Sequence, residues 1–176
     1  MPELNQFTRT AGYRRLRWPV DIHSKFTGER IHVAAVCYRI KDDEPEFLLV
    51  RTRGGRWTFP KGGVDDDATH AEAAAREAFE EAGVHGQIEH QPFHWYFHMK
   101  RGRLRSHGEV VPVQAHLCEV QRLVPPMERD RNPTWFKLEK ARRRLQENRT
   151  AEFADEVIEV LEQAVRQIRA RTLQLA

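Results

Sequence analysis

Short apolar runs rich in β-branched and aromatic residues alternate with polar, turn-forming stretches along most of the chain. Runs of this length and composition are typical of β-strands. The segment KDDEP between the first two runs has the turn-forming residues of a hairpin loop. The pattern predicts strands over residues 31–40, 46–51, 56–60, 86–90, 93–99, 110–120 and 134–137.

The C-terminal part of the chain has a helical rather than a strand-like pattern. It predicts a short helix over 139–146 and a long one over 150–171. In the long helix, apolar residues recur every three or four positions and form one stripe facing a core, namely Phe153, Val157, Leu161, Ala164 and Ile168. Strands that alternate with helices predict an α/β fold with a mixed sheet between helices. We expect residues 1–29 to form an irregular arm and residues 30–176 to form one domain.

The clearest helix in the sequence lies between Thr69 and Gly83. Thr69 stands three residues before Glu72, which is the spacing of a capping box at a helix start. Gly83 supplies the left-handed residue that often ends a helix. At about 100° per residue, one face of this helix is apolar and carries small side chains, with Phe79 at its edge. The members of this face are Ala71, Ala74, Ala75, Ala78 and Ala82.

The opposite face of the same helix concentrates negative charge. Glu77, Glu80 and Glu81 are spaced i, i+3 and i+4, so they lie close together and repel one another. Two of them lie in the last turn, where the helix dipole favours cations. Arg76 is the only nearby cation on this helix. A hard divalent cation bound through oxygen atoms would offset the repulsion, and the alternative is an ordinary solvated acidic face.

The spacing of the whole segment GGVDDDATHAEAAAREAFEEAGV resembles the Nudix box, the signature of the Nudix hydrolase family. The pattern is G-x5-E-x7-R-E-U-x-E-E-x-G-U, where U is aliphatic. Two positions depart from it, because Ala68 replaces the early Glu and Ala78 stands at an aliphatic position. The positions in register are Gly62, Arg76, Glu77, Glu80, Glu81, Gly83 and Val84.

The resemblance implies a Nudix-like α/β/α sandwich with a central mixed sheet and a site for Mg2+, with Mn2+ as the alternative. It implies that the metal ligands are Glu77, Glu80, Glu81 and the carbonyl oxygen of Gly62. It also implies that Arg76, Glu77 and Glu80 take part in catalysis, with Arg76 orienting Glu77 by a charge-assisted hydrogen bond.

The general base remains open, because Ala68 removes one carboxylate that the family uses. Glu77 is one candidate for this role. The aspartates at 65, 66 and 67 are possible substitutes for the missing carboxylate. Glu109 and Glu128 are candidates from outside the box, although a solvated surface position is the simpler interpretation of both.

Two segments that flank the box refine the functional hypothesis. FLLVRTRGGRWTFPKGG and RNPTWFKLEKARRRL resemble Nudix members acting on diphosphoinositol polyphosphates and dinucleoside polyphosphates. We therefore expect a divalent-metal-dependent hydrolase that cleaves a diphosphate linkage in a small, highly phosphorylated substrate. One alternative is a nucleoside triphosphate pyrophosphohydrolase. The other is a Nudix-fold binding module that has lost catalysis, which the missing carboxylate at Ala68 suggests.

Basic residues near the box are candidates for contacting substrate phosphates. We expect this role for Lys61, Arg51, Arg53 and Arg56. A second basic cluster lies in a predicted hairpin turn and consists of Lys100, Arg101, Arg103 and Arg105. It either contacts the substrate or prevents the sheet edge from pairing with another chain. His90, His94 and His98 are spaced four residues apart within a strand-like segment. Side chains at this spacing on a strand do not converge, so we do not expect a zinc site.

Composition narrows the class of protein but does not identify the reaction. The chain has 176 residues, 31% of them charged, and a formal net charge of +3. Its mean hydropathy is −0.71, its pI is about 9.1, and no run of about 18 apolar residues predicts a membrane span. No secretory leader is apparent, so we expect a cytoplasmic monomer or homodimer. Its basic residues are too scattered to favour nucleic-acid binding. We expect Cys37 and Cys118 to be buried, reduced thiols.

Overall fold

The computed structural model describes residues 31–100 and 109–175. Within this part, strands and helices alternate as the hydrophobic pattern predicts. The elements in chain order are β1 (His32–Lys41), β2 (Glu44–Arg51), β3 (Trp57–Thr58), β4 (Lys61–Gly63), α2 (His70–Ala82), β5 (Val84–Ile88), β6 (His94–Lys100), β7 (Glu109–Leu123), the 3-10 turn η2 (Arg129–Arg131), β8 (Thr134–Lys137), α3 (Leu138–Gln146) and α4 (Ala151–Leu175).

The strands form one mixed sheet whose main order is β3-β2-β1-β7-β5. β1 and β7 run parallel in its centre, with His32 opposite Val113 and Tyr38 opposite Glu119. The other pairings are antiparallel, including β4 on β1, β6 on β7 and β8 on β2. The mixed sheet predicted from the sequence is therefore confirmed.

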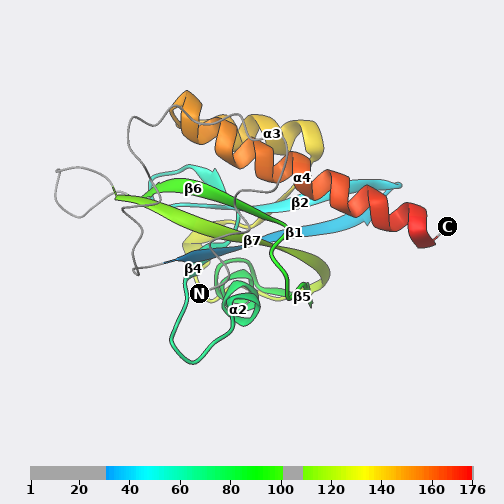
Figure 1. Ribbon diagram of the computed structural model, residues 1–176, viewed down its shortest axis with the longest axis horizontal. Coiled ribbons are helices and arrows are strands. Elements are labelled where there is room, and N and C mark those ends of the chain that lie inside the picture. The colour runs from blue at the N-terminus through cyan, green and yellow to red at the C-terminus, as the bar shows by residue number, and fades with distance from the viewer. Residues whose placement is uncertain (1–30, 101–108, 176) are drawn as a thin grey trace.

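Helices cover both faces of this sheet and bury a separate apolar core on each side (Figure 1). α3 and α4 lie over one face, where Phe47, Tyr96 and Leu117 pack against Val157 and Leu161. α2 lies under the other face, and its alanines pack against β1, β2 and β7. Small side chains on α2 bring its backbone close to the sheet, which places its acidic end beside β4.

The predicted boundaries of α2 are confirmed. The Thr69 hydroxyl accepts from the Glu72 N–H and the Glu72 carboxylate accepts from the Thr69 N–H, which completes the capping box. Gly83 ends the helix in the left-handed region at φ 67°, and its N–H donates to Phe79 O. One detail of the predicted face differs, because Ala73 is buried while Ala75 is only partly buried.

Two short elements near the site escape the sequence pattern. β4 has only three residues and contains two glycines, so its apolar signal is absent. η2 lies in a charged stretch and ends at Asn132, which is in the left-handed region at φ 47°. Several strand boundaries also differ. β2 begins at Glu44 because the hairpin turn uses only Asp42 and Asp43, both at positive φ. β5 begins directly after Gly83, and β7 runs on to Leu123.

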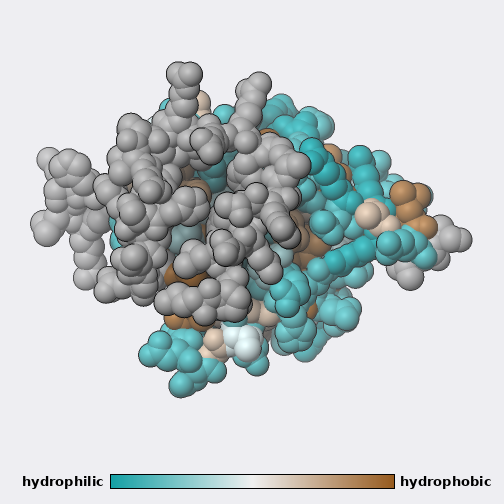
Figure 2. All heavy atoms as spheres, in the orientation of Figure 1, coloured by the Kyte–Doolittle hydropathy of each residue, from teal (hydrophilic) through white to brown (hydrophobic). Residues whose placement is uncertain are grey.

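The surface visible in Figure 2 is largely hydrophilic where it is coloured. Met127 and Leu173 are among the few large apolar side chains that are mostly exposed. None of the helices in the described ranges is long and apolar enough to cross a membrane. The predicted N-terminal arm lies outside the described residues, as do Arg101, Arg103 and Arg105 of the basic hairpin cluster.

Gly83 supplies the fold's most direct stability test. A Cβ at this position would lie 1.8 Å from the Val124 carbonyl oxygen, and the positive φ adds backbone strain. Gly83→Ala should therefore lower the free energy of unfolding by at least about 2 kcal/mol. Urea denaturation of the metal-free protein measures the effect. Gly63→Ala is the matched control, because a Cβ there meets nothing within 4 Å. Equal losses in both variants would contradict the packing argument.

Candidate functional site

The acidic end of α2 meets the short strand β4 at one close contact. A Cβ on Gly62 would lie 2.2 Å from Glu77 Oε1, so the Glu77 carboxylate occupies the space that any other side chain at position 62 would take. β4 is held in place by β1, with Gly62 opposite Val33. The glycine of the motif is therefore required by packing, and it brings the main chain of β4 against a carboxylate.

Glu81 is the most buried of the three acidic side chains, at 4% exposed. Its Oε2 accepts from the Lys61 main-chain N–H at 3.2 Å. Its Oε1 pairs with the Arg131 guanidinium at 2.8 Å. The helical period predicts Glu81 on the arc opposite the apolar face, and the sheet and η2 cover that part of the helix, so the carboxylate is enclosed.

Burial and crowding shift the acid–base properties of this cluster. Burial, with the negative charges of Glu81 and Glu80, raises the pKa of Glu77 to about 7, against the opposing effect of Arg76. Burial also raises the pKa of Glu81, although Arg131 and Lys61 counteract the rise. A cluster that resists ionisation in this way gains stability when a cation neutralises it.

Arg76 makes a different contact from the one that the resemblance implies. Its guanidinium pairs with Asp65 at 2.7 Å, and both side chains are substantially exposed. Its charge still acts on Glu77. Asp65 precedes the helix in the loop around Ala68, so an aspartate there engages the motif arginine, while Ala68 packs on the apolar core under the sheet.

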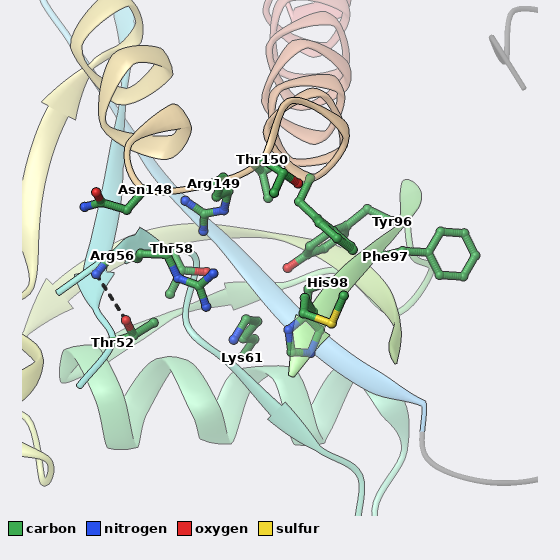
Figure 3. Close-up of a pocket in the computed structure, with 13 residues that line it drawn as sticks. Thr52, Arg56, Thr58, Lys61, Tyr96, Phe97, His98, Asn148, Arg149 and Thr150 are labelled. Atoms are coloured by element: carbon green, nitrogen blue, oxygen red, sulfur yellow. Dashed lines mark hydrogen bonds between the residues drawn. The ribbon is translucent and has the colours of Figure 1, made fainter. Parts of the chain in front are cut away.

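A pocket of about 150 Å³ opens on the other side of β4. Figure 3 shows Arg56, Lys61 and Arg149 directed toward this space from three different segments. The hydroxyl of Tyr96 points into it from β6. The residues that line the pocket are Thr52, Arg56, Thr58, Lys61, Tyr96, Phe97, His98, Met99, Asn148, Arg149, Thr150, Phe153 and Val157.

The cations of the pocket lie close enough to destabilise one another. Burial, with the charges of Arg149 and Arg56, lowers the pKa of Lys61 to about 8, against the opposing effect of Glu81. Burial and the charge of Arg56 lower the pKa of Arg149 to about 10. Arg149 is fixed by donating to Trp57 O at 2.8 Å and to Leu145 O at 2.5 Å.

Tyr96 adds a polar group whose bonding capacity is unused. Its side chain is 1% exposed, and its hydroxyl has no hydrogen-bond partner. A buried hydroxyl without a partner costs free energy, so it is usually satisfied by a ligand or water. With three cations beside it, the chemical complement of this pocket is an oxygen-rich anion.

The structure separates the four predicted phosphate-binding residues into two groups. Lys61 and Arg56 line the pocket. Arg51 instead donates to Gly55 O and lies over the Trp57 ring, and Arg53 is exposed in the following turn, so neither lines it. Of the predicted histidines, His98 lines the pocket and contacts His32.

Three residues of the site are not predicted from the sequence: Arg149, Arg131 and Tyr96. The local sequence around each gives little indication of a role in binding. Arg149 lies between two helices and Arg131 in a polar turn, where single arginines are common. Tyr96 belongs to an aromatic strand segment, which predicts core packing but not an unsatisfied hydroxyl. Glu128 was named only as an outside candidate, yet its charge acts on both Glu77 and Glu81.

The donor set fits a hard divalent cation. Three carboxylates crowd one end of α2, a carbonyl-bearing glycine packs against one of them, and oxygen ligands of this kind suit Mg2+ and Mn2+. Within residues 31–100 and 109–175, no three acidic, histidine or cysteine side chains already enclose a cation position.

The raised pKa of Glu77 gives a pH prediction for the metal-free protein. A carboxyl with a raised folded-state pKa contributes stability below its unfolded pKa and loses that contribution as the pH rises through the folded value. Wild-type protein should therefore lose stability relative to Glu77→Gln between about pH 4.5 and 7. Urea denaturation in chelator at pH 5 and pH 8 measures the difference, with Asp66→Asn in the exposed loop as control. A difference independent of pH would refute the assignment.

Comparisons with known proteins agree with this geometry. The family model described as the NUDIX domain matches residues 30–161. Nudix hydrolase 17, mitochondrial, from Arabidopsis thaliana is 33% identical over 148 residues, covering 80% of each chain. Diphosphoinositol polyphosphate phosphohydrolase 2 from Rattus norvegicus is 40% identical over 63 residues, covering 35% of each chain.

Solved structures show the same fold. A C. elegans Ap4A hydrolase in a binary complex aligns with a TM-score of 0.55 at 22% identity, covering 81% of this chain and 99% of that one. The fold likeness, the family model and the relative matched over most of both chains lead to one conclusion. The chain belongs to the Nudix hydrolase family, whose members are pyrophosphohydrolases acting on phosphoanhydride bonds.

Proposed function

We propose that this protein hydrolyses a diphosphate linkage in a small, highly phosphorylated substrate, with Mg2+ or Mn2+ as cofactor. One observation carries the proposal: a cationic pocket and a carboxylate cluster lie on opposite sides of the same three-residue strand, β4. Lys61 joins them, because its main-chain N–H binds Glu81 while its side chain lines the pocket. A phosphate held in the pocket thus lies next to the proposed metal ligands.

Glu77, Glu80 and Glu81, with the carbonyl oxygen of Gly62, would hold the divalent cation. When bound, such an ion neutralises phosphate charge and lowers the pKa of water. Glu80 lies in the last turn of α2, and its main-chain carbonyl accepts from the Glu128 N–H at 3.0 Å. This bond holds the segment after β7 against the site, so that Glu128 lies beside the proposed ligands.

Two carboxylates are suited to accept the proton of the attacking water. Glu77 is one candidate where it is not itself a metal ligand, because its carboxylate packs against the Gly62 main chain beside the other acidic side chains. Glu128 is the alternative, because it is half-exposed and close enough to influence the charges of Glu77 and Glu81. Glu109 is less suitable, since it is exposed at the start of β7 opposite Lys100.

The pocket favours a phosphate group over a nucleobase. At about 150 Å³ it is smaller than the roughly 300 Å³ of typical organic-ligand pockets, and three cations converge on it. An inositol ring that carries many phosphates would place one in the pocket while others meet nearby basic residues. This supports diphosphoinositol polyphosphates first and dinucleoside polyphosphates second, which are the substrate types suggested by the names of the rat relative and the C. elegans structure.

The competing functions make different demands on the site. A nucleoside triphosphate pyrophosphohydrolase would need a base-binding surface beside the pocket, where the lining residues with rings are Tyr96, Phe97, His98 and Phe153. A binding module without catalysis would tolerate Ala68 but would not need the crowded carboxylates.

We propose a cytoplasmic monomer or homodimer without a membrane or nucleic-acid partner.

A substrate panel tests the proposal. Diphosphoinositol polyphosphates, dinucleoside polyphosphates and nucleoside triphosphates are incubated with Mg2+ or Mn2+, and products are resolved by mass. We expect turnover of the first or second group, at least about 100-fold above Glu81→Gln, which removes one charge but keeps the shape. Circular dichroism verifies that this variant folds. Wild-type activity in Glu81→Gln at saturating metal, or turnover of nucleoside triphosphates alone, would refute the proposal.

A matched pair of arginine variants tests the pocket. Arg56→Met removes a cation that lines it, whereas Arg53→Met removes one from the neighbouring exposed turn. Charge-assisted contacts contribute about 1.5 kcal/mol or more, so Arg56→Met should raise KM at least about tenfold and Arg53→Met less than about twofold. Steady-state kinetics on the best panel substrate measures both. Equal effects would indicate a diffuse electrostatic attraction rather than a pocket.

A further inference from the structure

The segment between β7 and β8 is anchored to the C-terminal end of α2 by two main-chain hydrogen bonds. The Val124 N–H donates to Gly83 O at 2.9 Å, and the Glu128 N–H donates to Glu80 O at 3.0 Å. These bonds place η2 beside the last turn of the acidic helix. Arg131, the last residue of η2, is thereby brought to the carboxylates from a segment that is 50 residues distant in sequence from Glu81.

Arg131 bridges two carboxylates of the cluster. One terminal nitrogen of its guanidinium lies 2.8 Å from Glu81 Oε1. Its Nε lies 2.5 Å from Glu128 Oε2. The Arg131 side chain is 18% exposed and the Glu81 side chain 5% exposed, so this ion pair is largely shielded from solvent.

Both carboxylate oxygens of Glu81 are engaged. Its second oxygen accepts from the Lys61 N–H at 3.2 Å, so both carboxylate oxygens already have donors. A buried carboxylate needs a positive partner, and Arg131 supplies it. A divalent cation that binds Oε1 would weaken its hold on the guanidinium, because the cation draws on the charge of that oxygen and repels the positive guanidinium.

We propose that Arg131 is an internal counter-cation that holds Glu81 in the metal-free protein and yields it when a divalent cation binds. This inference rests on the proposed function, because it takes Glu81 as a metal ligand. Its geometric basis is the pairing that directs Oε1 of Glu81 toward Arg131. Glu128 retains Arg131 nearby after the exchange, because its contact uses a different nitrogen of the guanidinium.

If Arg131 gives up Glu81 to the metal, the expected change in metal affinity on removing Arg131 is opposite to the change expected if Arg131 supports the metal ligand. If Arg131 competes with the metal, its removal makes metal binding tighter. If Arg131 instead orients Glu81 for coordination, its removal makes binding weaker, as is usual for groups that support metal ligands. The direction of the change in affinity therefore separates the two roles without any measurement of activity.

The experiment is a titration of metal-free protein with Mn2+, in which electron paramagnetic resonance measures the free ion. The variants are Arg131→Gln, Arg131→Lys and Glu81→Gln. Arg129→Gln is the matched control, because it removes the same charge from an exposed position of the same turn. We expect Arg131→Gln to bind Mn2+ about tenfold more tightly than wild type, Arg131→Lys to lie between the two, and Arg129→Gln to change affinity by less than about twofold.

Thermal unfolding provides a second readout. Metal-free Arg131→Gln should melt below wild type because Glu81 loses its partner, and saturating Mn2+ should raise its Tm more than that of wild type. If Arg131→Gln does not fold without metal, Arg131→Lys carries the test, because it keeps the charge and loses the two-carboxylate bridge.

Unchanged or weaker Mn2+ binding in the Arg131 variants overturns the exchange while leaving the proposed function intact, provided that Glu81→Gln still weakens binding. If Glu81→Gln binds Mn2+ as tightly as wild type, the metal site itself is misassigned and the proposed function fails with it.

Discussion

The site depends on one contact, the approach of the Gly62 main chain to the carboxylate of Glu77. The contact requires a residue without a side chain at position 62 and a helix that lies close to the sheet. The alanine face of α2 provides the second condition, since Ala74, Ala78 and Ala82 pack directly on the sheet core. Larger side chains there would raise the helix and separate the carboxylates from β4.

The same strand separates two regions of opposite charge. Beneath it lie the glutamates of α2: burial raises the pKa values of Glu77 and Glu81, and the charges of Glu81 and Glu80 also raise that of Glu77. Above it lie Lys61 and Arg149, whose pKa values burial lowers. Each region is destabilised by its own charge and is suited to a ligand of opposite sign. A metal–phosphate substrate supplies both charges at once, which explains why such a ligand suits this fold.

Local sequence signals were sufficient where neighbours along the chain determine the structure. The capping box at Thr69 and the left-handed Gly83 depend on interactions within a few residues, and both were predictable. The alternation of strands and helices also identified the fold class, because burial on each face imposes its own hydrophobic period. The Nudix resemblance identified the glutamates, since their spacing on one helix is a local property.

The missing parts of the site come from contacts between distant segments. Arg149 reaches the pocket from the turn between α3 and α4, and Arg131 reaches Glu81 from the turn after β7. Neither arginine has a local pattern that distinguishes it from a surface arginine. Arg53 illustrates the reverse case, because its proximity in sequence to Arg56 does not bring it into the pocket.

A crystal grown with Mn2+ and a non-hydrolysable diphosphate substrate analogue tests the central claim most directly. Anomalous diffraction locates the metal independently of any model of the side chains. Our account predicts a peak within coordination distance of the carboxylates of Glu77, Glu80 and Glu81 and the carbonyl of Gly62, with a phosphate of the analogue beside Lys61. An ordered analogue with no metal peak at these residues, or with the metal bound elsewhere, would contradict it.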